Sequence, residues 1–129
     1  MHELRYRKQW LALGWVMIGI VIYLSLMPYP PQPLDVSNAD KIEHGLAYAG
    51  LALWFFQLVR KSSRVGVGLA LCLLGVAIEI AQSFTPTRSF ELADMGADAA
   101  GVLLGALLIF TRLGRLLAGM ERLLIAKAV

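Results

Sequence analysis

The sequence has almost no cysteine and little charge. Cys72 is the single cysteine and lies within an apolar run, so a disulfide framework is excluded and a small buried side chain is expected there. Charged residues make up only 16% of the 129 residues, whereas hydrophobic residues make up 58%. A typical soluble domain has about 25% charged residues. The composition therefore indicates one small domain that lies mostly in a lipid bilayer.

Proline is scarce outside one short segment. Four of the five prolines fall in residues 28–33, where no helix is expected, directly after an apolar run at 10–27. The start of the chain is basic, as in a signal peptide, but the apolar run is long for one and no A-x-A-like cleavage site follows. We therefore interpret the run as an uncleaved first membrane span.

Further apolar runs follow, separated by short polar segments. Their lengths predict four transmembrane helices, near residues 10–27, 40–59, 65–84 and 90–111. Residues 112–129 repeat leucines at helical spacing with arginines on another face, which predicts an amphipathic helix on the membrane surface. A straight continuation of the fourth helix is the alternative. The predicted fold is an all-α, polytopic membrane protein with a C-terminal amphipathic helix.

Basic residues are placed on one side of these spans. Ten of the twelve lysines and arginines lie before the first helix, between the second and third, or after the fourth; Lys41 and Arg88 lie on the other side. Positive charge marks the cytoplasmic side of a membrane, so both termini are expected to be cytoplasmic. The net charge of +3 is thus explained by topology, and we expect no nucleic-acid partner.

Polar side chains gather near the outer ends of three predicted helices. Their spacing by three or four places them in one stripe on each helix. The stripes consist of Asp40, His44 and Tyr48, then Glu79, Gln82 and Ser83, then Asp94 and Asp98. A charge at the centre of a spanning helix costs about 2.5 to 3.5 kcal/mol, so Glu79 in particular is expected to have a partner or a function.

This combination of residue types suggests two kinds of chemistry. Glu79, His44 and Asp94 are candidates for proton transfer, and Arg88 and Lys41 are candidates for phosphate binding. The remaining candidate ligand-binding residues are Asp40, Tyr48, Gln82 and Asp98. A cluster with one histidine and no cysteine does not predict a zinc site, and no metal or cofactor is predicted, although oxygen ligands leave a hard cation open. Structural roles as helix caps or interhelical hydrogen bonds are the alternatives.

The spacing of these blocks resembles the VanZ-like family of small bacterial membrane proteins. The blocks are Asp40-Lys41-x-x-His44-x-x-x-Tyr48, Glu79-x-x-Gln82, Arg88, and Asp94-x-x-x-Asp98 followed by Gly101 and Gly105, and the resemblance covers roughly residues 27–105. At the position of Asp98 the family more often has asparagine. The founding member is associated with low-level teicoplanin resistance, so the resemblance implies a role in the cell envelope of a bacterial cytoplasmic membrane.

Three functions are compatible with the sequence. The first is an outer-leaflet pocket that binds or modifies an anionic lipid or a lipid-linked envelope precursor. The second is a proton-coupled transporter that acts as a homodimer, although a site near one leaflet differs from the midplane site that alternating access requires. The third is a non-catalytic assembly partner whose polar residues only hold the helices together. The sequence does not decide between catalysis and binding.

Overall fold

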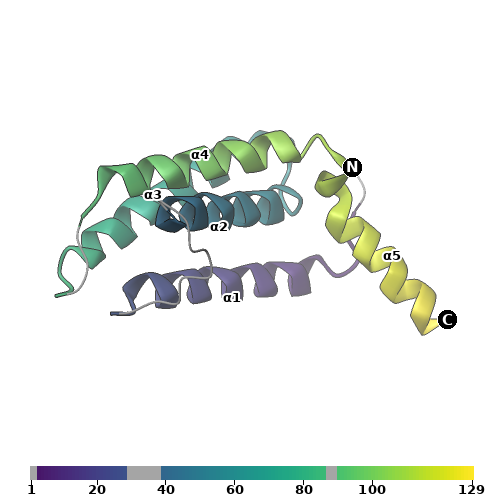
Figure 1. Ribbon diagram of the computed structural model, residues 1–129. Helices are drawn as coiled ribbons and strands as arrows, with labels where there is room; N and C mark the ends of the chain where they lie inside the picture. Colours follow the sequence, from purple (N-terminus) through teal and green to yellow (C-terminus); the bar gives the residue numbers. More distant parts are fainter. Residues whose placement is uncertain (1–2, 29–38, 87–89) are drawn as a thin grey trace.

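The computed structural model describes residues 3–28, 39–86 and 90–129 (Figure 1). These residues form helices and contain no strand, so the all-α prediction is confirmed for the described part of the chain. The proline-rich segment from residue 29 to 33 and Arg88 lie outside the described residues.

Four long helices and one shorter one follow each other along the chain. They are α1 (Arg7–Leu26), α2 (Ala39–Phe56), α3 (Arg64–Gln82), α4 (Leu92–Leu108) and α5 (Leu116–Ala128), and 3₁₀ turns at η1 (Lys61–Ser63) and η2 (Arg112–Arg115) precede α3 and α5. Consecutive helices among the first four run in opposite directions, as Figure 1 shows. The start of α1, the end of α2, the start of α3 and the end of α4 therefore share one end of the bundle, called here the basic end. The opposite end is called the acidic end.

Helix α2 lies at the centre of the bundle and packs most extensively against α4. The contact is close because glycine leaves the surface of α4 open. A Cβ atom added at Gly105 would lie 2.6 Å from the Cβ of Ala52, and one added at Gly101 would overlap the carbonyl oxygen of Gly45. Two glycines spaced by four, such as Gly101 and Gly105, are typical of helices that pack this closely in membranes.

The surface of the bundle is apolar and its interior is partly polar. Trp15, Val65 and Leu107 are between 66% and 73% exposed, whereas Glu79 is completely buried. Contiguous apolar surface of this kind is unfavourable in water and is typical of a protein whose sides contact lipid. The structure therefore agrees with the membrane protein that the composition predicts.

Two helices are long and apolar enough to cross a bilayer by themselves. They are α1, with 20 residues, and the 22-residue helix Lys61–Gln82 that includes η1 and α3. Helix α2 carries Asp40, Lys41 and Glu43 in its first two turns, and α4 has only 17 residues. The pair α4 and α5 would count as a third span if it were one broken helix, but its two parts are bent by 77°. The prediction of four spans is therefore not established by helix length and composition alone.

Helix α5 is fixed to the basic end of the bundle. Leu117 is completely buried and packs with Trp10 and Leu58. The carboxylate of Glu121 accepts hydrogen bonds from the backbone N–H groups of Arg5 and Tyr6, at 2.9 and 2.8 Å, and from the indole N–H of Trp10 at 2.8 Å. We call these three hydrogen bonds the Glu121 anchor.

The bend before α5 decides between the two interpretations of the tail. A straight continuation of α4 is wrong, because η2 and the 77° bend separate α4 from α5. Most of the apolar face that the leucine spacing predicts is exposed, at Leu116, Met120 and Leu124. This face is free to contact lipid, while Leu117 and Glu121, four residues apart, attach the helix to the bundle.

Candidate functional site

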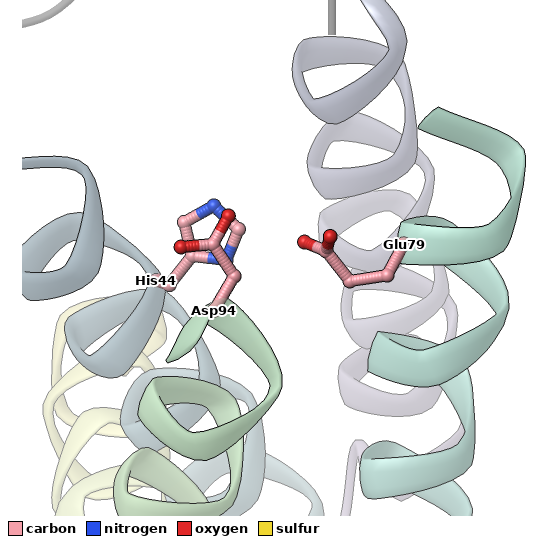
Figure 2. A group of neighbouring side chains, drawn as sticks. All are labelled: His44, Glu79 and Asp94. Atoms are coloured by element: carbon pink, nitrogen blue, oxygen red, sulfur yellow. The ribbon is translucent and has the colours of Figure 1, made fainter. Parts of the chain in front are cut away.

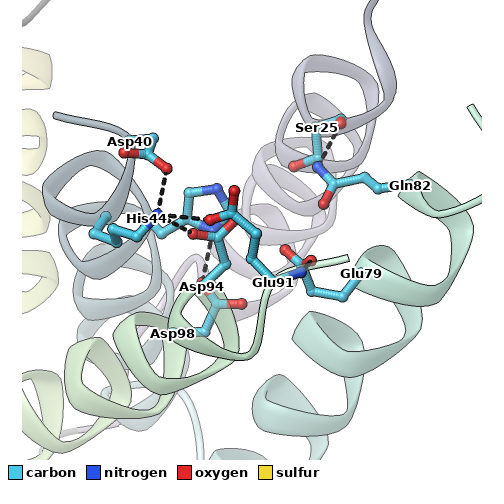
Figure 3. Close-up of polar contacts among 9 residues, drawn as sticks. Ser25, Asp40, His44, Glu79, Gln82, Glu91, Asp94 and Asp98 are labelled. Carbon is cyan, nitrogen blue, oxygen red and sulfur yellow. Dashed lines mark hydrogen bonds and ion pairs between the residues drawn. The ribbon is translucent and has the colours of Figure 1, made fainter. Parts of the chain in front are cut away.

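The acidic end of the bundle brings together seven ionisable side chains from three elements. Helix α2 contributes its first turns, α3 its last turn, and α4 its first turns together with the residue before it (Figure 3). We call this group the polar cluster, and it consists of Asp40, Lys41, His44, Glu79, Glu91, Asp94 and Asp98. Because α2 and α4 run in the same direction, their stripes of residues spaced by four descend side by side from this end.

Lys41 lies among three carboxylates at the mouth of the cluster. Its ammonium group is 2.7 Å from an oxygen of Asp40, 2.7 Å from one of Glu91 and 3.2 Å from Oδ1 of Asp94. The contact with Asp94 has the distance of an ion pair but not the geometry of a hydrogen bond. Lys41 was predicted to hold a phosphate, and in the structure its charge is already balanced within the protein. Glu91 was not identified from the sequence, because it precedes α4 and belongs to no helical stripe.

His44 and Asp98 form a buried pair one turn deeper. Nδ1 of His44 lies 3.0 Å from Oδ1 of Asp98, whose side chain is only 4% exposed. A Cβ atom added at Gly75 of α3 would lie 2.6 Å from Oδ2 of Asp98, so the absence of a side chain at Gly75 makes room for this carboxylate. Asp98 thus fixes the orientation of the imidazole ring, and Nε2 of His44 remains available for another partner.

Glu79 links α3 to the beginning of α4. It is completely buried, and its Oε2 accepts a hydrogen bond from the backbone N–H of Glu91 at 3.0 Å. Glu91 is the residue that caps α4, so the carboxylate lies near the positive end of that helix. Oε1 of Glu79 is buried and has no hydrogen-bond partner among the described residues.

Gln82 and Tyr48 lie at the edges of the polar cluster. The amide of Gln82 donates a hydrogen bond to the carbonyl oxygen of Ser25 at 2.7 Å, which ties the end of α3 to the end of α1. Tyr48 is 3% exposed and continues the stripe of His44 toward the apolar core, and its hydroxyl has no hydrogen-bond partner within the described part of the chain. The structure therefore gives Gln82 an interhelical role and leaves the role of Tyr48 a prediction.

Three potential metal ligands converge inside the polar cluster. One ring nitrogen of His44 and one carboxylate oxygen each of Glu79 and Asp94 lie within 4.8 Å of one another, and Figure 2 shows the three side chains reaching toward each other from α2, α3 and α4. A second group with the same spacing consists of Asp40, Glu91 and Asp94. Lys41 contacts all three members of this second group, so its ammonium group already supplies the positive charge there.

The cluster is suited to proton transfer or to the binding of a cation. It contains five carboxylates against one lysine and one histidine, and several of these groups are shielded from solvent. Exposure falls from 41% at the side chains of Asp40 and Glu91 to 10% at Asp94 and 4% at Asp98, so the cluster has a mouth and an interior. A charged or hydrogen-bonding ligand would therefore enter past Asp40 and Glu91.

A hollow also lies elsewhere on the molecule. It is an apolar groove of about 520 Å³ between α3 and α4, and residues such as Gly68, Val102 and Phe110 line it toward the basic end. It contains no residue of the polar cluster. The lining that the structure describes is apolar apart from Arg64 and Cys72, so the polar cluster remains the candidate site.

Comparison with known proteins agrees with the resemblance found in the sequence. The sequence pattern of the VanZ/LLP1 family matches residues 9–115. An uncharacterized protein from the fission yeast Schizosaccharomyces pombe is 33% identical over 106 residues, which is 79% of this chain and 63% of that protein. The chain thus spans less than two thirds of the length of this relative, and no solved structure matches. Since the relative is fungal, location in a bacterial membrane stays a prediction.

Proposed function

The chain belongs to the VanZ/LLP1 family of small helical membrane proteins, and we propose that its polar cluster binds the headgroup of an anionic lipid or of a lipid-linked precursor. Modification of the bound headgroup is part of the same hypothesis. The association of the family with teicoplanin resistance is consistent with a substrate in the cell envelope of a bacterial cytoplasmic membrane.

The observation that carries this proposal is the burial of ionisable groups from three helices at one end of an apolar bundle. Glu79, Asp94 and Asp98 are at most 7% exposed. Charged side chains in a membrane-embedded position are costly and mark binding or transport sites in most membrane proteins. Neither the apolar groove nor the basic end offers a comparable group of residues.

The proposed topology places the cluster at the non-cytoplasmic face. We propose that α1 to α4 all cross the bilayer, with α2 and α4 spanning about 27 and 26 Å at 1.5 Å per residue. Basic residues at the other end, among them Arg7, Arg60 and Arg112, then mark the cytoplasmic side, and both termini lie there. The mouth of the cluster then faces the headgroups of the outer leaflet, where envelope lipids and lipid-linked precursors are expected.

The cluster divides into a part for recognition and a part for chemistry. Arg88 belongs to the loop between α3 and α4, and in this proposal it supplies the positive charge for a phosphate, since Lys41 is balanced by three carboxylates. His44, held by Asp98, and Glu79 lie deeper and can exchange a proton with a headgroup hydroxyl or a bound water.

Lipid retention after gentle extraction tests this proposal. Native mass spectrometry of the wild-type protein should detect a bound anionic lipid that is lost in Arg88→Ala. The matched control is Arg60→Ala, which removes the same charge from the opposite end and should keep the lipid. If Arg88→Ala and Glu79→Gln proteins both retain the lipid at the wild-type level, the proposal fails.

A purely structural role is the second candidate, and specific contacts favour it. Glu79 bonds to the backbone N–H of Glu91, and His44 pairs with Asp98 across the contact of α2 and α4. If these contacts only hold helices together, Glu79→Gln should lower thermal stability in detergent together with function. A protein with lost lipid binding and unchanged stability would exclude this alternative. The position of the cluster at one end disfavours a transporter, whose site would lie near the midplane.

A further inference from the structure

His44, Glu79 and Asp94 have the arrangement of three ligands around a single ion. Their nearest nitrogen and oxygen atoms lie within 4.8 Å of one another (Figure 2). Ligand atoms bound at about 2.0 to 2.2 Å from a metal are at most about 4.4 Å apart, so small side-chain movements would complete the geometry.

The carboxylate of Glu79 supplies an independent indication of a ligand. The residue is completely buried, yet its Oε1 has no hydrogen-bond partner among the residues that the structure describes. A buried carboxylate oxygen without a partner is costly and uncommon in folded proteins. Oδ1 of Asp94 is also shielded and has no hydrogen bond there, although it lies 3.2 Å from the ammonium of Lys41. A cation between Glu79 and Asp94 would compensate both oxygens.

His44 has a carboxylate partner of the kind that metal-binding histidines usually have. Its Nδ1 lies 3.0 Å from Oδ1 of Asp98, so with the proton on Nδ1 the other nitrogen, Nε2, carries a free lone pair. A carboxylate that accepts from one imidazole nitrogen while the other binds a metal fixes the ring and raises its basicity. Asp98 is therefore a positioning residue in this site.

We infer that His44, Glu79 and Asp94 bind one divalent transition-metal ion of the Mn²⁺ or Zn²⁺ class. One imidazole nitrogen suits Zn²⁺, two carboxylate oxygens suit Mn²⁺, and three protein ligands leave at least one coordination position open. The neighbouring group of Asp40, Glu91 and Asp94 is not a second site, because Lys41 contacts all of its members.

This inference rests on the proposed headgroup site. It adds an explanation of how a pocket rich in carboxylates can bind an anionic headgroup. The ion balances the charges of Glu79 and Asp94, and a phosphate oxygen of the headgroup occupies the open coordination position.

Metal binding is measured on the full chain in detergent after removal of bound ions with a chelator. Titration with Mn²⁺, followed by the loss of the electron paramagnetic resonance signal of free Mn²⁺, should give one site per chain. Pulsed spectra of the bound ion should contain a single nitrogen coupling, and because the chain has two histidines, persistence of this coupling in His2→Ala assigns it to His44. Isothermal titration with Zn²⁺ is the parallel measurement.

Variants then locate the ion. Glu79→Gln and His44→Ala should each weaken Mn²⁺ binding by about 100-fold or more, and loss of the positioning contact in Asp98→Ala by about 10- to 100-fold. Glu3→Gln, which removes an exposed carboxylate at the opposite end of the bundle, is the matched control and should bind as the wild type does. Absence of a wild-type site for either ion, a bound ion without nitrogen coupling, or equal weakening in Glu3→Gln would overturn the inference.

The chelator also separates this inference from the proposed function. If the bound lipid is retained after the ion is removed, the lipid site stands and the metal bridge does not. If Mn²⁺ binds as described and no lipid accompanies the protein, the metal site stands and the headgroup proposal fails.

Discussion

Nδ1 of His44 lies 3.0 Å from Oδ1 of Asp98, and this contact joins α2 to α4 inside the polar cluster. The two helices approach closely because glycine occupies the surface of α4 just below the pair, at Gly101. One stripe of α4 therefore carries both Gly101, which allows the close packing, and Asp98, whose carboxylate contacts His44.

Substitution of Asp98 tests the positioning role. Asp98→Asn keeps an oxygen that can accept from the imidazole N–H, so the ring orientation and the thermal stability should change little. Asp98→Ala removes the acceptor and opens space beside Gly75, so it should lower both the stability and the affinity for lipid. Thermal unfolding in detergent and lipid retention measured together check this prediction. Equal effects of both changes on lipid retention would show that the charge, and not the orientation of His44, is what matters.

Substitution of Gly101 tests the contact between α2 and α4. A Cβ atom at this position meets the carbonyl oxygen of Gly45, which belongs to the backbone and cannot turn away. Gly101→Ala should therefore destabilise the fold by about 1 to 3 kcal/mol. Unfolding of the protein in mixed micelles measures the change.

Gly96 provides the matched control on the same helix. Outside the adjacent turns of α4, no atom of the described residues lies within 4 Å of a Cβ atom added there, so Gly96→Ala should be neutral or stabilise the helix by up to about 1 kcal/mol. If both alanine variants have the same stability, close packing of α4 on α2 does not depend on Gly101.

The Glu121 anchor predicts a stability that depends on pH. Burial disfavours the carboxylate, but hydrogen bonds from Tyr6, Trp10 and Arg5 outweigh this effect and hold the pKa of Glu121 below its ordinary value of 4.5. A group whose pKa is lower in the folded state stabilises the fold fully above its unfolded-state pKa. This contribution is lost as the pH falls through the folded-state pKa.

Glu121→Gln should therefore destabilise the protein at neutral pH by about 1.5 to 3 kcal/mol, since one amide cannot accept all three hydrogen bonds. The difference from the wild type should stay constant down to about pH 5 and shrink below roughly pH 4.5. Glu3→Gln is the control, because Glu3 is exposed. A difference that persists undiminished in acid would mean that the charge of Glu121 contributes nothing.

Addition of Mn²⁺ should stabilise the wild-type protein against heat. Binding to the folded state alone contributes about 2.7 kcal/mol at a metal concentration 100 times the dissociation constant. Glu79→Gln should abolish this increase, and without metal it should be at least as stable as the wild type, because it removes a buried charge. A metal-free Glu79→Gln protein that is much less stable would indicate that the carboxylate serves the fold by itself.

Helical spacing was sufficient to predict which residues gather at the acidic end. Asp40 and His44 are four apart on α2, and Asp94 and Asp98 are four apart on α4, so each pair had to share a face. Charge asymmetry directs all of them to one end of the helices, but it does not decide which helix faces meet. The structure places these residues together as the spacing indicates, while their chemical roles stay predictions.

Contacts that depend on the rotation of one helix against another were not predictable. The enclosure of Lys41 by three carboxylates requires Glu91, which precedes α4 and follows no periodic pattern. The space that Gly75 leaves for Asp98 and the bond from Gln82 to Ser25 likewise depend on how α3 lies against its neighbours. A single sequence contains no signal for such pairs.

The tail was predicted only in its local pattern. Leucine spacing indicated an amphipathic helix, but nothing near Glu121 in the sequence points to Tyr6, which is 115 positions away. The anchor depends on the fold, which brings residues near both ends of the sequence together at the basic end of the bundle.

The same distance in sequence has a consequence for biosynthesis. Arg5, Tyr6 and Trp10 leave the ribosome well before their common partner, which is made more than 100 residues later. The first helix must therefore enter the membrane with these three N–H groups still bound to water or to lipid headgroups. Only after residue 121 has been synthesised can they exchange those partners for the carboxylate, so these early residues wait for a late one before their contacts are complete.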